Sequence, residues 1–203
     1  MSKQSKDTRQ EIIEAARDEF LTHGFEGARL HHIADHIGVT KAMIHYYFNT
    51  KQKLFEHVYK QSVQIIFEDL NDVLSKDVPL FKKIELLIEN SLQKADQSPR
   101  VLSFVITEIS RKPDWLQPIF EDQVALQVTS FEKELTGAAS NYEIASVSVQ
   151  DLLMNIFSLC YYPVIAGPIH QSLFDIEDAA SEQGFSQKRK GVILDTILNW
   201  LTA

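Results

Sequence analysis

Cysteine, glycine and proline are scarce in this chain of 203 residues, which contains one cysteine, seven glycines and six prolines. The single cysteine, Cys160, excludes an intrachain disulfide framework and a cysteine zinc cluster, and it fits a reducing compartment. The low glycine and proline content, with 44% hydrophobic and 24% charged residues, excludes a collagenous, low-complexity or wholly disordered protein.

Long hydrophobic runs are also missing. The longest apolar stretch covers about residues 152–165, is interrupted by Asn155 and Pro163, and is shorter than the roughly 20 residues of a membrane-spanning helix. Residues 1–8 are polar and no apolar core follows their lysines, so we expect no signal peptide. These absences predict a soluble, cytoplasmic protein without a membrane partner.

Motifs of catalysis are absent as well. The sequence has no Gly-rich phosphate loop, no Gly-x-Ser-x-Gly and no His-Glu-x-x-His, so we expect neither an enzyme nor a cofactor. His32 and His36 have the spacing of metal ligands on a helix, but no cysteine or carboxylate pair accompanies them, and we expect no metal site. Cys160 lies in an apolar run, which favours a small hydrophobic side chain over a reactive thiol.

Charge is unevenly distributed, although the net charge of −8 would argue against a nucleic-acid partner if it were evenly spread. Residues 1–60 hold nine Lys and Arg against eight Asp and Glu, whereas residues 61–203 hold eleven against twenty. Six of the seven histidines precede residue 60. A near-neutral, histidine-rich N-terminal part therefore precedes an acidic remainder. This fits a small DNA-binding domain, or simply a domain with fewer acids.

Apolar residues recur at helical spacing nearly throughout, which predicts an all-α fold of about nine helices. A capping box, Thr8-x-x-Glu11, predicts the start of the first helix, and Gly24 its end. A short helix over 30–36 ends at Gly38, and Thr40 caps the next. Further helices are expected from Asn49 to Val73, over 79–94, 99–112 and 115–135, from a second capping box at Ser140 to Tyr162, and over 186–201, with 167–184 as a connection.

The two short helices on either side of Gly38 are joined by a turn of the length found in a helix-turn-helix unit. Apolar residues are expected to hold the pair against the first helix: Leu30, Ile33, Ile37, Val39, Ile44 and Phe48. The small Ala42 allows close approach to a major groove, and Lys41 supplies a donor to a base edge. The outward residues of the second of these helices are Lys41, Ala42, Met43, His45, Tyr46 and one edge of Tyr47.

The runs 24–34 and 38–48, followed by Lys51 and Leu54, resemble the DNA-binding domain of TetR-family transcriptional regulators over about residues 9–58. The resemblance implies a homodimer that represses promoters, with a small-molecule cavity in its larger domain. It divides the chain into a three-helix DNA-binding domain, residues 1–48, and a helical effector-binding and dimerisation domain, residues 49–203.

Position by position, the resemblance implies groove contacts at Lys41, Ala42, Met43, His45 and Tyr47, and phosphate contacts at Thr40 and Lys51. We add Tyr46, Arg29 and His31 to this predicted DNA-binding surface. The chain departs from the family where His45 replaces a common Tyr and His31 a basic residue. It also departs where Ala28-Arg29 replaces a Thr pair, which removes a helix cap worth about 1 kcal/mol.

The larger domain offers two sets of candidate residues. Aromatic residues between helices, with one acid, are candidates for an effector site, although core packing explains each of them individually. These are Phe104, Glu108, Trp115, Phe120, Phe157 and Tyr161. Two wide apolar faces predict a dimer interface, with burial inside one chain as the alternative; its residues are Leu152, Ile156, Leu159, Ile193, Ile197 and Trp200.

Together these features predict a homodimeric repressor that binds a near-palindromic DNA operator and is released by a small-molecule effector. The alternative is a DNA-binding architectural protein that responds to no effector and recruits a protein partner.

Overall fold

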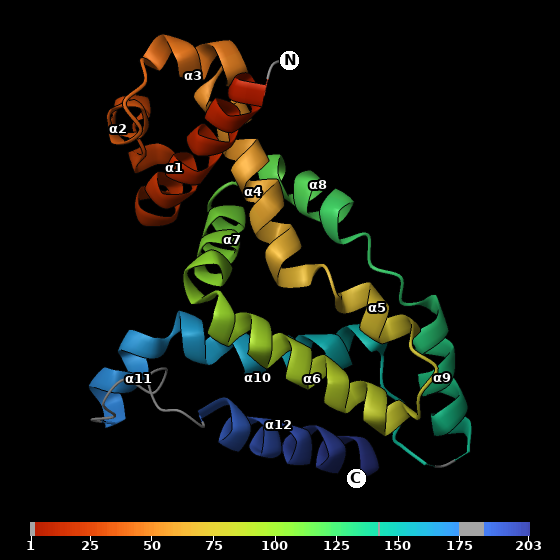
Figure 1. The fold of residues 1–203 in the computed structure, drawn as a ribbon. Coiled ribbons are helices and arrows are strands. Elements are labelled where there is room, and N and C mark those ends of the chain that lie inside the picture. Colours follow the sequence, from red (N-terminus) through yellow and green to blue (C-terminus); the bar gives the residue numbers. More distant parts are fainter. Residues whose placement is uncertain (1–2, 142, 175–184) are drawn as a thin grey trace. The chain divides into compact units, whose positions relative to one another are not determined.

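The computed structural model describes residues 3–141, 143–174 and 185–203, and every regular element in these ranges is a helix (Figure 1). The all-α prediction is confirmed. In chain order the helices are α1 (Lys3–Gly27), α2 (Leu30–His36), α3 (Lys41–Phe48), α4 (Lys51–Phe67), α5 (Leu70–Ser75), α6 (Leu80–Gln97), α7 (Pro99–Arg111), α8 (Pro113–Val124), α9 (Thr129–Ser140), α10 (Val149–Ile165), α11 (Gly167–Phe174) and α12 (Phe185–Thr202).

The chain packs as two compact units. Unit 1 comprises Met1–Ile65 and Ser103–Val124, and unit 2 comprises Ile66–Leu102 and Ala125–Ala203. The unit that contains the helix-turn-helix thus also includes most of α4, most of α7 and all of α8. No helix among the described residues is long and apolar enough to cross a membrane.

Helix α1 begins before the predicted start, and the predicted end at Gly24 is a kink within it. The helix begins at Lys3, so Thr8 lies inside it and does not cap it. Gly24 interrupts the helical geometry with a φ of 64° and a ψ of −177°, a combination open essentially to glycine alone. The chain then continues to Gly27 before α2 begins.

Two expected helices are each divided. The helix expected from Asn49 to Val73 is split into α4 and α5, and the helix expected over 115–135 is split into α8 and α9. Asn71 holds the second break: its side-chain oxygen accepts the Gln127 N–H at 2.9 Å, and its amide donates to the Ala125 carbonyl at 3.3 Å. A side chain far away in sequence therefore satisfies backbone groups that a continuous helix would have paired.

The second capping box was also wrong. Ser140 lies in the last turn of α9, where its hydroxyl donates to the Thr136 carbonyl at 2.8 Å. Ser148 caps α10 instead, because its Oγ accepts the Asp151 N–H at 3.0 Å. Pro163 lies inside α10, which ends two residues later at Ile165. Helix α11 occupies the first part of the expected connection, and residues 175–184 lie outside the described ranges.

Each unit has its own core. In unit 1 the side chains of Phe20, Ile33, Ile44 and Phe55 are almost completely buried, which joins α1, α2, α3 and α4. In unit 2, α6 packs against α10 and α12, and its core includes Ile84, Leu87, Ile88, Leu152, Ile156, Ile193 and Ile197.

Candidate DNA-binding surface

The turn between α2 and α3 is fixed by backbone hydrogen bonds around Gly38. The Val39 N–H donates to the Ala34 carbonyl at 3.0 Å, and the Gly38 N–H donates to the Asp35 carbonyl at 3.4 Å. These are the two bonds of a Schellman motif, which requires a residue with positive φ at its centre, and Gly38 has a φ of 67°. The sequence therefore specifies this turn locally.

Thr40 caps α3, as predicted. Its Oγ1 accepts the Met43 N–H at 3.3 Å, and its own backbone is extended. The side chains of Thr40, Lys41 and Ala42 are exposed. The N-terminus of α3 is thus ordered and open, which suits contact with phosphate or a base edge.

Helix α3 has a buried and an exposed side. Ile44 and Phe48 are buried in unit 1, and the Arg9 guanidinium lies 5.0 Å from the centre of the Phe48 ring. The outward side carries predicted DNA-binding residues: Lys41, Ala42, Met43, His45 and Tyr46 are exposed, and Tyr47 is half-buried. Tyr46 is 79% exposed and packs edge-on against Tyr47 with ring centres 5.2 Å apart.

His45 and Asn49 are joined by two hydrogen bonds at the C-terminal end of α3. The Asn49 N–H donates to the His45 carbonyl at 2.8 Å, and the His45 ring nitrogen Nδ1 lies 2.8 Å from the Asn49 carbonyl oxygen. Asn49 has the unusual dihedral angles φ 58° and ψ −54°. The Thr50 N–H donates to the Phe48 carbonyl at 2.6 Å, which closes a γ-turn centred on Asn49.

The start of α2 is held by a carboxylate from α1. Arg29 occupies the N-cap position without a side-chain cap. Instead, Glu19 Oε1 accepts the Arg29 N–H at 2.8 Å and lies 3.1 Å from His32 Nδ1. Burial opposes ionisation of Glu19, but the Arg29 and His32 hydrogen bonds and the nearby His23 outweigh it, so the pKa of Glu19 is lowered. Glu19 thus holds the segment where the family's threonine pair is absent.

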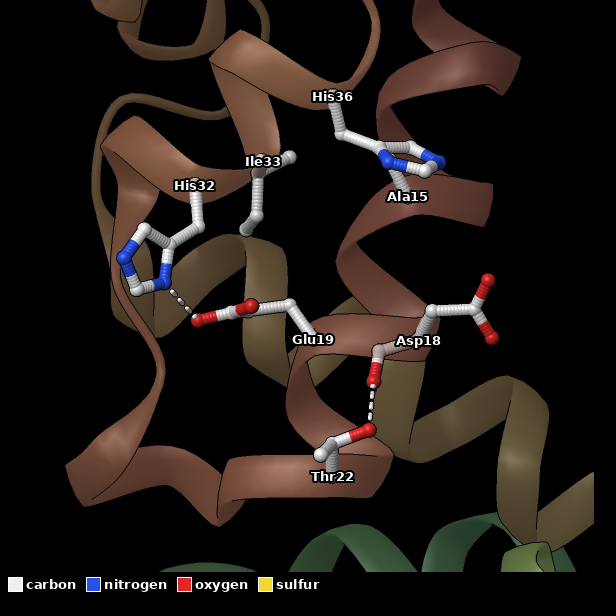
Figure 2. A pocket seen from close by; sticks show the side chains of 7 residues that line it. All are labelled: Ala15, Asp18, Glu19, Thr22, His32, Ile33 and His36. Carbon is white, nitrogen blue, oxygen red and sulfur yellow. Dashed lines mark hydrogen bonds and ion pairs between the residues drawn. The ribbon is translucent and has the colours of Figure 1, made fainter.

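A shallow hollow of about 280 Å³ lies between α1 and α2. Figure 2 shows His32 turned toward Glu19, and His36 and Ala15 also line the hollow. No group of three His, Cys, Asp or Glu side chains within the described ranges is arranged to hold a metal ion. His31 is exposed and contacts the His32 ring edge-on, with ring centres 4.3 Å apart.

Lys51 lies at the start of α4, half-buried. Its ammonium is 4.8 Å from the centre of the Phe25 ring, which is a cation–π contact. Desolvation is the main cause that lowers the pKa of Lys51, and the nearby Glu26 and Glu19 oppose the shift. The predicted phosphate-binding cation is therefore positioned by an aromatic ring of unit 1.

The predicted effector-site residues fall in both units. Phe104, Glu108, Trp115 and Phe120 belong to unit 1, whereas Phe157 and Tyr161 belong to unit 2. In unit 1, Phe104 and Trp115 contact the Phe55 ring at 5.6 and 5.4 Å, and the indole N–H of Trp115 donates to Glu56 at 3.0 Å. In unit 2, Phe157 and Tyr161 stack with ring centres 5.5 Å apart.

Four of the six predicted dimer residues are fully buried inside the single chain: Leu152, Ile156, Ile193 and Ile197. Leu159 is half-buried and Trp200 is 36% exposed. Besides Trp200, the apolar side chains that α10 and α12 expose include Met154 at 65% and Val192 at 55%. Of the six predicted interface residues, Trp200 is the exposed one, and the sequence did not single out Met154 or Val192; the interface itself stays a prediction.

Sequence reasoning missed two residues that position the surface, Glu19 and Asn49. Glu19 acts on Arg29 and His32, ten or more residues away in the chain. Asn49 was expected only as the first residue of a helix, and it acts instead through a positive φ that the sequence did not indicate. The departure at Ala28-Arg29 was the available signal for Glu19, since it left the start of α2 without a local cap.

Comparisons with known proteins identify a family model that matches the part of the chain containing the helix-turn-helix, and relatives that match a larger part of the chain. The family model of bacterial regulatory proteins, tetR family, matches residues 12–58. The HTH-type transcriptional regulator RutR of Escherichia coli K12 is 27% identical over 148 residues, covering 72% of this chain and 69% of that protein. The "Probable acrEF/envCD operon repressor" of the same strain is 33% identical over 96 residues, covering 46% and 43%.

The fold of the whole chain is also known from solved structures. The transcriptional regulator FadR of Bacillus subtilis, in complex with stearoyl-CoA, superposes with a TM-score of 0.67 at 16% identity, covering 95% of this chain and 98% of that one. At this identity the likeness shows the fold alone.

Proposed function

Since the chain belongs to the TetR family of transcriptional regulators, we propose that this DNA-binding regulator is a homodimeric repressor whose α3 contacts base edges in the major groove. We further propose that a small-molecule effector releases it from its operator. A protein that acts on the chromosome of a bacterium works in the cytoplasm, which is the location this proposal requires.

The exposed side of α3 is the observation that carries the proposal. The side chains of Lys41, Ala42, Met43 and His45 are open to solvent, while Ile44 and Phe48 fix the helix to the core. A rigid short helix with a capped, accessible N-terminus fits a major groove, where base pairs differ in their donors and acceptors. Lys41 and Lys51 provide charge for phosphate contacts, so affinity should fall with salt.

This function requires a dimer, because two copies of α3 spaced by about 34 Å reach successive major grooves of a near-palindromic operator. We place the partner on the exposed apolar side chains of α10 and α12, Met154, Val192 and Trp200. Replacement of Met154 or Val192 by Glu should produce monomers in light scattering, whereas Leu126→Glu, at another exposed apolar position, should leave the mass unchanged.

Effector binding is proposed from family membership and from the aromatic side chains that the helical part of the chain presents. FadR, a structural neighbour with this fold, was solved with stearoyl-CoA, so apolar compounds are the first effector class to test. Helices α4 and α7 contribute residues to both units, so they are the candidates to connect effector and DNA sites. A melting-temperature screen against acyl-CoA thioesters and other apolar metabolites tests this; no shift with any compound favours the effector-independent alternative.

Selection of bound fragments from random duplex DNA tests the central proposal. We expect one enriched near-palindrome, and loss of enrichment for Lys41→Ala and Tyr47→Ala. Lys133→Ala removes an exposed lysine from α9 and serves as the matched control, which should bind like the unaltered protein. Binding that is indifferent to sequence, or equal in all four proteins, contradicts the proposal.

A further inference from the structure

The γ-turn at Asn49 orients the imidazole of His45. Asn49 is a non-glycine residue with positive φ, a conformation that is uncommon and strained outside glycine. This conformation presents the Asn49 carbonyl oxygen to His45 Nδ1 at 2.8 Å, one turn back along the chain. A strained backbone position therefore holds the ring of an exposed side chain on the outward side of α3.

The hydrogen bond also determines which ring nitrogen carries the proton. A carbonyl oxygen can only accept, so Nδ1 must be the donor. In the neutral imidazole the other nitrogen, Nε2, is then an acceptor. Among the described residues no hydrogen bond to Nε2 is formed, and His45 is exposed. The side chain thus presents a single acceptor to a ligand on this surface.

We propose that His45 determines specificity by accepting a hydrogen bond from an exocyclic amine, the N6 amine of adenine or the N4 amine of cytosine. These are the two hydrogen-bond donors on base edges in the major groove, where guanine presents N7 and O6 and thymine presents O4 as acceptors. An acceptor on Nε2 therefore favours an amine and disfavours a guanine or thymine edge at one position in each half-site.

This inference rests on the proposed function, since it requires α3 to lie in the groove. A phosphate contact by His45 is the competing role. Phosphate oxygens accept hydrogen bonds, and the neutral ring with its proton on Nδ1 has no second donor. The neutral side chain thus fits a base amine better than a phosphate.

The tautomer is tested without DNA. Nitrogen-15 NMR of the full-length protein at pH 8 should show His45 with a protonated Nδ1 and an unprotonated Nε2. His36→Gln and His31→Gln variants assist the assignment of the resonance. A His45 ring protonated mainly on Nε2 overturns the proposal, whether or not the protein binds DNA.

The base preference is tested with the selected operator and with analogues of it that lack one exocyclic amine. Replacing the contacted adenine by purine, or the cytosine by 2-pyrimidinone, removes the amine and should weaken binding by roughly fivefold to tenfold. His45→Phe should bind amine-containing and amine-free operators equally, and His45→Gln, which has both a donor and an acceptor, should accept more bases at that position. His36→Phe is the histidine control and should keep the discrimination of the unaltered protein.

The outcomes separate this inference from the function on which it rests. If the unaltered protein selects an operator but His45→Phe lowers affinity uniformly and reduces the salt slope by about one, His45 contacts phosphate and the amine proposal is wrong. If removing the amine weakens binding of the unaltered protein and of His45→Phe by the same factor, the amine proposal is also wrong. If the unaltered protein selects no sequence at all, the proposed function fails, and the base-reading role fails with it.

Discussion

The Glu108 carboxylate on α7 accepts a hydrogen bond from the Phe25 N–H at 3.2 Å. Glu108 is only 3% exposed, and its other oxygen lies 3.2 Å from the Arg111 guanidinium. A Cβ placed on the neighbouring Gly24 would lie 2.7 Å from Glu108 Oε1. The buried acid thus fits closely against the end of α1, within unit 1. This contact occupies a side chain that the sequence placed in the effector site, a role that stays a prediction.

Gly24→Ala should therefore destabilise the protein. The substitution adds a side chain at a φ of 64° and a ψ of −177°, and it also displaces the Glu108 carboxylate. The backbone alone costs about 1–3 kcal/mol. Urea unfolding measures the loss, with Gly137→Ala as control: that glycine lies in α9 with open space around it, so the alanine should be neutral or stabilising by up to about 1 kcal/mol. Equal stability of Gly24→Ala and the unaltered protein contradicts the prediction.

Much of the helix-turn-helix could be predicted from the sequence because its signals are local. Gly38 supplies the positive φ, Thr40 supplies the cap, and Ile44 and Phe48 mark the buried side of α3. Each of these acts within a few residues of its position in the chain, so spacing alone identifies it.

The breaks and the interfaces could not be predicted in the same way, because they depend on contacts between distant residues. The break between α8 and α9 is stabilised by Asn71, more than fifty residues earlier in the chain. Periodicity showed that Leu152 and Ile193 are apolar, but whether a neighbouring helix or a second chain covers such residues depends on the folded arrangement. In the structure α6 packs against the helices that carry these two residues, α10 and α12.

Replacing the buried Lys83 should cost less stability than removing its ion-pair partner, Glu134. Its ammonium is 2.6 Å from Glu134, and the residue is 1% exposed. Glu134→Ala leaves a buried cation without its partner, which should cost about 2 kcal/mol. Lys83→Met removes the charge and keeps the volume, so it should cost less than about 1 kcal/mol. Denaturant unfolding compares the two, and a larger loss for Lys83→Met would falsify the assignment of the pair.

Cys160 should be unreactive in the folded protein. It is buried between helices of unit 2, with Sγ 3.9 Å from the Ile88 carbonyl, and burial raises the pKa of its thiol to about 12. The thiolate is the nucleophile, so its population at pH 8 is very small. A thiol reagent should label the native protein at least roughly 100-fold more slowly than the protein in denaturant. A Ser110→Cys variant, at an exposed position, should react promptly; equally prompt labelling of Cys160 would contradict a structural role.

Glu85 should stabilise the folded protein near neutral pH and lose this contribution in acid. Hydrogen bonds from Lys82 and then Lys190 lower the pKa of Glu85 from 4.5 to about 2, which connects α6 to α12. A carboxyl with a lowered folded-state pKa stabilises the protein above its unfolded value, near 4.5, and loses that contribution as the pH falls toward 2. Glu85→Gln should therefore melt below the unaltered protein at pH 6, and the difference should shrink by pH 2.5. Glu132→Gln, at an exposed position on α9, should show no such convergence.

Glu19 should control the start of α2. Glu19→Ala removes the acceptor of the Arg29 N–H and the partner of His32, and the loss should be about 1–3 kcal/mol. Glu19→Gln keeps an acceptor oxygen and should lose less. Glu11→Ala, an exposed acid on the same helix, is the matched control and should be near neutral.

Hydrogen exchange locates the effect of Glu19→Ala. The Arg29 amide should exchange faster in that variant, because its acceptor is gone, while the amides of Gly38 and Val39 keep theirs in the Schellman motif. Because α2 packs on α3, a loosened α2 should also reduce the affinity for the selected operator. Unchanged Arg29 exchange with unchanged affinity would show that the segment before α2 is held by other contacts, and that the missing threonine cap needs no replacement.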